Sequence, residues 1–202
     1  MAKLPVSFYQ DYDVISLAKQ LLGKQLFTFV DGELTGGMIT ETEAYRGVSD
    51  KASHAYGGRF TPRTEVMYKK GGISYVYLCY GMHHLLNVVT AGEGTPHAVL
   101  IRGIEPRIGI DIMLHRRNKI KLQPQLTAGP GALSQALAVD RTLNGKAFTG
   151  NEIWIEDSDV VISHQQIVAT KRIGIAYAQE HAELPWRFYI RGNPFVSKPN
   201  KG

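Results

Sequence analysis

Apolar positions near the start of the chain predict an amphipathic helix. They recur at helical spacing over residues 14–22, with Asp13 placed to cap the helix and Gly23 placed to end it. We therefore expect one short helix before the first strand.

A hairpin is predicted directly after this helix. Two apolar runs, 26–30 and 34–45, are separated by Asp31-Gly32, a dipeptide typical of two-residue hairpin turns. Gly36-Gly37, inside the second run, indicates a bulge or a close approach of another backbone.

The remaining pattern contains more strands than helices. Residues 46–65 are polar and rich in Gly and Pro, and a loop of that length in a compact domain is more often functional than idle. Strands are expected at 73–79, 85–90, 98–104, 153–156, 160–162, 172–176 and 187–191, and helices at 108–117 and, opened by Gly129-Pro130-Gly131, at 132–139. Because helices and strands do not alternate, we predict an α+β fold. It is a single domain over residues 1–202 with a mostly antiparallel curved β-sheet, surrounding helices and a protruding β-hairpin.

Composition excludes several classes of protein. The chain is 44% hydrophobic and 20% charged, which is typical of a globular protein and not of a disordered chain or a coiled coil. No apolar run is long enough to span a bilayer, and the first residues lack the apolar core of a signal peptide. Cys79 is the only cysteine, so no disulfide framework and no multi-thiolate zinc site is expected. We also find no zincin, zinc-deaminase, P-loop or dinucleotide motif, and predict no metal and no cofactor.

The charge distribution suggests a polyanionic partner. The formal net charge is +5, and the positive charge is concentrated in two blocks. Residues 102–121 carry six Lys and Arg against two Asp and Glu, residues 171–202 carry the same numbers, and residues 1–58 carry five against seven. Such blocks are typical of nucleic-acid binding, although many globular proteins are mildly basic.

Two glutamates in the second hairpin strand are candidates for acid–base chemistry. Strand alternation places Glu41, Glu43 and Tyr45 on one face, with the two glutamate Cα atoms about 7 Å apart. Buried together, the carboxylates would raise each other's pKa, which suits a general base. The alternative, which the pattern alone favours, is a solvated edge strand whose charges face water.

The predicted turn at 80–82 carries Tyr80 and Met82, although turn tips are usually polar. Proteins that kink DNA insert apolar or aromatic side chains between base steps. A tip that folds back onto the core would explain the same residues equally well.

The 46–65 loop and one apolar strand contribute further candidates. A Gly-Gly-Arg turn ending at Arg59, with Arg63 nearby, offers backbone amides and cations to phosphate groups. Arg102 lies in an otherwise apolar run and needs a partner. A carboxylate such as Glu43 would serve, as would simple exposure at the strand end.

Together these features resemble the alkyladenine (3-methyladenine) DNA glycosylase family, and the resemblance extends over about residues 15–197. It is carried by segments matching in order and spacing: Leu21-Leu22-Gly23, Glu41–Tyr45, His54, Gly57-Gly58-Arg59, Thr61-Pro62-Arg63, Tyr75–Tyr77, Tyr80-Gly81-Met82, Asn87, Leu100–Arg102, Glu105-Pro106, Gly129-Pro130, Gln135–Leu137 and Arg187–Gly192. The combination of ETEAY with YVY-x-x-YGM is the most specific part.

The resemblance implies catalytic roles for three residues. Glu43 would deprotonate the water that attacks the sugar C1′, and the Arg102 side chain and the Ile173 carbonyl would hold that water.

It implies further roles in recognition. Tyr45, Tyr77 and His54 would sandwich and hydrogen-bond a base flipped out of DNA, and Asn87 would clash with the 2-amino group of guanine. Tyr80 would intercalate where the base has left. His54 is also the candidate proton donor for neutral leaving bases.

The implied function is a monofunctional glycosylase of base excision repair. Its substrates would be 3-methyladenine and 7-methylguanine in double-stranded DNA, with hypoxanthine and ethenoadenine as further candidates. We expect a monomer without membrane contact. It would be cytoplasmic and associated with the nucleoid in a bacterium, or nuclear in a eukaryote. The alternatives are a non-catalytic binder of nucleic acid and a carbohydrate glycosidase using Glu41 and Glu43 as its carboxylate pair.

Overall fold

The computed structural model describes residues 2–158 and 160–199. Its three α-helices in these ranges are α1 (Val14–Gln20), α2 (Ile110–Arg116) and α3 (Pro130–Ala136). Its strands there are β1 (Gln25–Val30), β2 (Glu33–Tyr45), β3 (Ser74–Cys79), β4 (His83–Thr90), β5 (His97–Ile108), β6 (Ile153–Glu156), β7 (Ile167–Thr170) and β8 (Arg187–Ile190). Short 3-10 turns connect them, among them η2 (Gly47–Ser49), η3 (Tyr56–Gly58), η4 (Glu65–Tyr68) and η8 (Ala176–Glu183).

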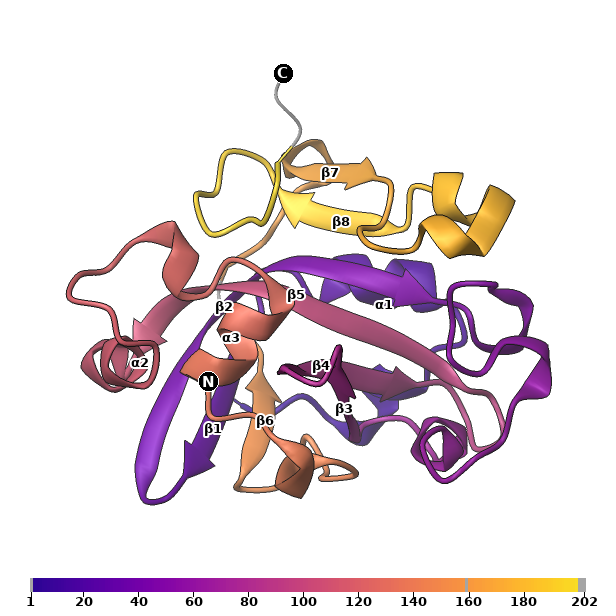
Figure 1. The fold of residues 1–202 in the computed structure, drawn as a ribbon, viewed down its shortest axis with the longest axis horizontal. Coiled ribbons are helices and arrows are strands. Elements are labelled where there is room, and N and C mark those ends of the chain that lie inside the picture. Colours follow the sequence, from indigo (N-terminus) through magenta and orange to yellow (C-terminus); the bar gives the residue numbers. More distant parts are fainter. Residues whose placement is uncertain (1, 159, 200–202) are drawn as a thin grey trace.

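One antiparallel sheet organises the fold, in the order β3-β4-β5-β2-β1-β6. The long strand β2 pairs with β5 along one edge. Along its other edge it pairs first with β1 and then, over Glu41–Glu43, with β8. Figure 1 shows β7, in orange, beside β8, in yellow, and the β3–β4 hairpin near α3. The predicted α+β class with a curved antiparallel sheet is confirmed.

The predicted β1–β2 hairpin and the bulge after it are also confirmed. Asp31 and Gly32 both have positive φ, 54° and 78°, as a two-residue turn with the twist of a hairpin requires. The β2–β5 register shifts between Gly36 and Gly37. A Cβ atom on Gly37 would lie 2.3 Å from the Glu105 carbonyl oxygen, so only glycine permits this approach.

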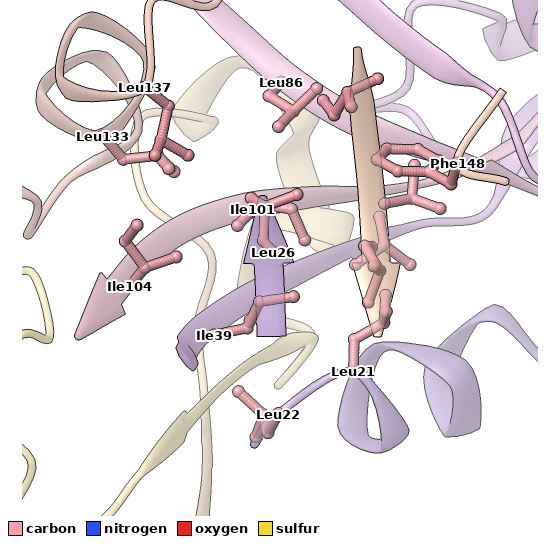
Figure 2. Packing of buried hydrophobic residues seen from close by; sticks show 14 of the residues in the cluster. Leu21, Leu22, Leu26, Ile39, Leu86, Ile101, Ile104, Leu133, Leu137 and Phe148 are labelled. Atoms are coloured by element: carbon pink, nitrogen blue, oxygen red, sulfur yellow. The ribbon is translucent and has the colours of Figure 1, made fainter. Parts of the chain in front are cut away.

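The main hydrophobic core lies between the sheet and its helices. Asp13 caps α1 by accepting hydrogen bonds from two backbone amides of the first turn. Figure 2 shows Leu21 and Leu22 after α1, Ile39 from β2, Ile101 and Ile104 from β5 and Leu133 from α3 around this core. The site strands β2 and β5 are thus held by packing along most of their length.

Two predicted strands are wrong, and one strand was not predicted. Residues 160–162 and 172–176 contain no strand. The segment 172–176 is bent by Gly174, whose φ is 77°, and the Arg172 side chain there is turned inward to a buried partner. The strand lies instead at β7, whose β-branched run pairs with β8.

Other boundaries also moved. The strand predicted over 98–104 continues as β5 through Pro106, because those residues pair only with β2 and no second neighbour needs the missing N–H. The helix expected at 108–117 therefore begins only at Ile110. The helix expected at 132–139 begins at Pro130, with proline in its first turn, and ends at Ala136. Within the described residues, none of the helices is long and apolar enough to cross a membrane.

Candidate functional site

Glu41 and Glu43 lie in the middle of the sheet and not at a solvated edge. A bulge shifts the β2–β5 register at Glu41, and both side chains are completely buried between β5 and β8. The guanidinium of Arg102 contacts both carboxylates, so they share one face as predicted. The solvated alternative is wrong.

The Glu43 carboxylate is held by three neighbours. The Ile173 backbone N–H donates to Oε1 at 2.8 Å, and the Tyr45 hydroxyl donates to Oε2 at 2.8 Å. Arg102 Nη1 lies 3.4 Å from Oε1. Burial raises the pKa of Glu43 above its ordinary value, against the opposing effects of Arg102, the Ile173 amide and Tyr45; Glu41 adds a smaller rise. At Ile173 the structure thus shows the backbone amide bound to Glu43, whereas the role implied by the resemblance belongs to the carbonyl.

Arg102 is buried, so exposure does not satisfy it. Its nearest partner is Glu41, to which Nε donates at 2.8 Å, and Glu43 is the second. Burial opposes the charge, but the two carboxylates together raise the pKa of Arg102 and keep it protonated.

A cavity of about 660 Å³ opens beside these groups. The expected site residues that line it are Tyr45, His54, Arg63, Tyr77, Tyr80, Asn87, Arg102 and Ile173. Glu43 is not among the lining residues, but all three of its contacts are, so its carboxylate lies directly behind the cavity wall. Arg59 and Met82 do not line the cavity.

His54 is fixed within this cavity. Its Nδ1 lies 2.8 Å from the Tyr75 hydroxyl, and its ring meets the Tyr77 ring edge-on with centroids 4.6 Å apart. Burial, with the charges of Arg63 and Arg59, lowers the pKa of His54 to about 4. The ring is therefore neutral near pH 7, which argues against the proton-donor role expected for it.

The remaining lining residues complete the wall. Asn87 is buried, and its amide Nδ2 donates to the Tyr75 carbonyl at 3.1 Å. The Arg63 guanidinium lies 5.0 Å from the centre of the Tyr77 ring, at the mouth of the cavity.

The β3–β4 turn projects its apolar side chains into solvent. Tyr80 is 85% exposed and Met82 is 72% exposed, so the tip is not folded onto the core. Tyr80 also has a φ of 50°, a left-handed backbone that is unusual for an aromatic residue. Positive φ at Tyr80 and Gly81 is the backbone that a two-residue hairpin turn requires, so the turn itself sets the direction of the Tyr80 ring.

Several residues around the site have roles that the sequence pattern does not reveal. Arg187 and Ser197 surround Glu41, and Arg172 pairs with Asp50 behind Tyr45. An arginine in the otherwise apolar run around Arg187 repeats the pattern seen at Arg102 and could have indicated this role.

The arrangement suits hydrolysis of a bond that joins a flat, electron-poor ring to the rest of a substrate. Tyrosine faces favour a cationic heterocycle, and a buried carboxylate with raised pKa beside an arginine can orient and deprotonate a water. Among residues 2–158 and 160–199, no cluster of His, Cys, Asp or Glu could hold a metal ion. Glu41 is surrounded by hydrogen-bond donors and does not line the cavity. The carbohydrate-glycosidase alternative needs a second carboxylate that can reach the substrate, and Glu41 cannot serve as one.

Comparison with known proteins gives a consistent result. The family model described as "Methylpurine-DNA glycosylase (MPG)" matches residues 7–194. Three bacterial relatives carry the provisional name 3-methyladenine DNA glycosylase. A Desulfitobacterium hafniense protein is 46% identical, with 98% of this chain and 99% of the relative covered. A Chlamydia felis protein is 50% identical over 93% and 95%, and a Bacillus thuringiensis protein is 48% identical over 96% and 98%.

Proposed function

The chain belongs to the methylpurine-DNA glycosylase family, and from this premise we propose that it releases alkylated purines, 3-methyladenine foremost, by means of a water activated by Glu43. As a member of that family it is a DNA glycosylase, a hydrolase of DNA repair. The observation that carries the proposal is the Glu43 carboxylate behind the wall of a cavity lined by Tyr45 and Tyr77.

The reaction needs one base and a stabilised cation. Water adds to C1′ and gives its proton to Glu43, while the electron pair of the N-glycosidic bond leaves with the base. An N-alkylated purine is cationic, so that pair neutralises it and no acid is required. The carboxylate also stabilises the developing positive charge on the sugar, while Arg102 and the Ile173 segment orient the water.

The cavity supports purine binding. The Tyr45 and Tyr77 rings each have a guanidinium against one face, and each would offer its remaining π face to a cationic base. Neutral His54, whose Nδ1 is held by Tyr75, would offer Nε2 for hydrogen bonding in exchange for its 3.4 Å contact with Arg63 Nη2. Asn87 lies in the wall, where its amide would meet the 2-amino group of guanine. We propose 7-methylguanine as a further substrate, because its cationic base leaves without an acid even though its 2-amino group meets Asn87. We also propose hypoxanthine and ethenoadenine, which lack that amino group; as neutral bases they leave as anions that take up a proton from water.

DNA contact is assigned to the rim of the cavity. Tyr80 would enter the stack left by the flipped base, with Met82 beside it, and the exposed Arg59 and Arg63 would meet phosphates. Among the described residues no lysine lines the cavity, which supports hydrolysis without a covalent lysine intermediate.

The test is single-turnover base release from duplex DNA containing 3-methyladenine or 7-methylguanine. Glu43→Gln keeps the shape of the side chain but removes the base, so we expect release to slow by about 100-fold or more while lesion binding persists. Glu65→Gln, an exposed glutamate in η4, is the matched control and should excise like the unaltered protein.

Excision by Glu43→Gln at the unaltered rate would show that Glu43 is not the base in this reaction. An unaltered protein that binds lesion DNA but releases no base would instead support the non-catalytic binder.

A further inference from the structure

Glu41 is enclosed by hydrogen-bond donors and does not line the cavity beside Glu43. Its Oε1 accepts from Arg102 Nε at 2.8 Å, from Arg187 Nε at 2.7 Å and from Ser197 Oγ at 2.9 Å. Its Oε2 accepts from the Ser197 backbone N–H at 2.7 Å. A fully buried carboxylate with this many donors is fixed in place and is not available to act on a substrate.

Residues 195–198, here called the C-terminal clasp, complete this enclosure. The Thr40 hydroxyl donates to the Phe195 carbonyl at 2.7 Å, and Arg187 Nη2 donates to the carbonyls of Ser197 and Lys198. The clasp also passes so close to β5 that a Cβ atom on Gly103 would lie 2.6 Å from the Phe195 carbonyl oxygen. It is thus attached to both strands that carry the site.

These contacts determine how Arg102 is oriented. Its Nε is taken by Glu41, and its Nη2 donates to Ser197 Oγ at 3.0 Å. Only Nη1 remains toward Glu43, at 3.4 Å. An unrestrained guanidinium beside a carboxylate prefers a two-point pair, and such a pair would occupy both Glu43 and Arg102.

We propose that Glu41, together with the C-terminal clasp, is a positioning residue for the glycosylase reaction. It holds Arg102 so that a single nitrogen addresses Glu43 and the guanidinium stays at the cavity wall. This inference rests on the proposed function of Glu43.

The charges facing Glu43 predict a pH signature. They are Arg102 from β5 and Glu41 on β2 itself, with Tyr45 and the Ile173 amide as hydrogen-bond donors. Arg187, on the neighbouring β8, is paired with Glu41. Because Glu41 helps to raise the pKa of Glu43, removing its charge lowers that pKa. The rate depends on ionised Glu43, so its decline on the acid side moves to lower pH.

The experiment compares single-turnover release of 7-methylguanine by the unaltered protein, Glu41→Gln and Ser197→Ala across pH, together with lesion-DNA affinity and thermal unfolding. We expect Glu41→Gln to lower the plateau rate by about tenfold or more and to move the acid limb to lower pH, with affinity unchanged. Ser197→Ala removes one acceptor of Arg102 but leaves the backbone contact to Glu41, so we expect about a threefold loss.

Glu105→Gln is the matched control. Glu105 is a β5 carboxylate that accepts from Asn193 near the clasp and pairs with Arg107 rather than with Arg102. Its variant should keep the plateau rate and the acid limb of the unaltered protein. An unchanged plateau and limb in Glu41→Gln would overturn the inference while leaving the proposed function intact. If Glu41→Gln does not fold, an unaltered rate in Ser197→Ala overturns it instead. Failure of the unaltered protein to release base would be a failure of the proposed function.

Discussion

At the scale of single residues, burial decides the protonation state of the site. Glu43 and His54 are shifted in opposite directions, because burial disfavours the charged form of each: it raises the pKa of the carboxyl and lowers that of the imidazole. His54 therefore contributes a neutral ring. Recognition of a base by His54 therefore does not change across the pH range in which free histidine titrates.

The lowered pKa of His54 can be measured directly. NMR titration of the ring protons should give a pKa of about 4, because burial is reinforced by the charges of Arg63 and Arg59. Arg63→Gln removes the second-largest contribution and should raise that pKa toward the ordinary 6.5. Arg141→Gln is the control: Arg141 is an exposed arginine in the 3-10 turn η6 (Arg141–Leu143), and its variant should leave the pKa of His54 unchanged. A His54 resonance that titrates near 6.5 in the unaltered protein would contradict this account.

The residues of the site differ in how readily sequence predicts them. Glu43 and Tyr45 lie in one short motif, and alternation along a strand is enough to place them on one face. Arg187 and Ser197 reach Glu41 from 146 and 156 residues away. No local pattern encodes such a meeting, since it depends on β8 pairing with the bulged part of β2.

At the scale of elements, local chemistry predicted the hairpins well. Asp31-Gly32 and Tyr80-Gly81 both form turns with positive φ at two central residues. The strand β7 was not predicted, and the strands predicted at 160–162 and 172–176 do not form. All three segments are short runs rich in β-branched residues. Only the presence of a pairing partner distinguishes these three segments, and of the three only β7 pairs with β8.

The β3–β4 hairpin carries a prediction of its own. Tyr80→Gly removes an exposed ring, and glycine adopts the left-handed backbone at that position without strain, so folding stability should be unchanged or higher. Lesion-specific DNA affinity should fall by about tenfold, because loss of aromatic stacking on a base costs about 1–3 kcal/mol. Affinity for undamaged duplex should change much less. Both are measured by fluorescence anisotropy at fixed salt.

Tyr12→Ala provides the comparison for the hairpin variant. Tyr12 is also an exposed tyrosine, but it precedes α1 and does not line the cavity. Its variant should bind both DNAs as the unaltered protein does. Equal losses on damaged and undamaged DNA in Tyr80→Gly would mean that the ring makes only general contacts.

At the scale of the whole molecule, buried ion pairs join distant segments around the cavity. Asp50, in the loop after β2, accepts from Arg172 Nη2 at 2.9 Å, and neither side chain is exposed. The same guanidinium donates to the Ala44 carbonyl and lies 4.8 Å from the centre of the Tyr45 ring. The pair therefore connects the 46–65 loop, β2 and the segment after β7, which together form one side of the cavity.

Breaking this pair should destabilise the protein in a pH-dependent way. Burial alone would raise the pKa of Asp50, but hydrogen bonds and charge from Arg172 outweigh it and hold the pKa below its ordinary value. Asp50→Asn leaves a buried guanidinium without its counter-charge, so we expect a loss of about 3 kcal/mol in the free energy of unfolding at pH 7. A carboxyl whose folded pKa is lowered stabilises the fold above its unfolded pKa and loses that contribution as the pH falls through the folded value. Denaturant unfolding should therefore show a difference in unfolding free energy between Asp50→Asn and the unaltered protein that is constant between about pH 5 and 8. This difference should become smaller under strongly acidic conditions.

Glu183→Gln, which breaks an exposed pair with Lys171, is the control and should lower the free energy of unfolding by less than about 1 kcal/mol. A loss as small as this in Asp50→Asn would show that the buried pair does not hold the cavity wall together.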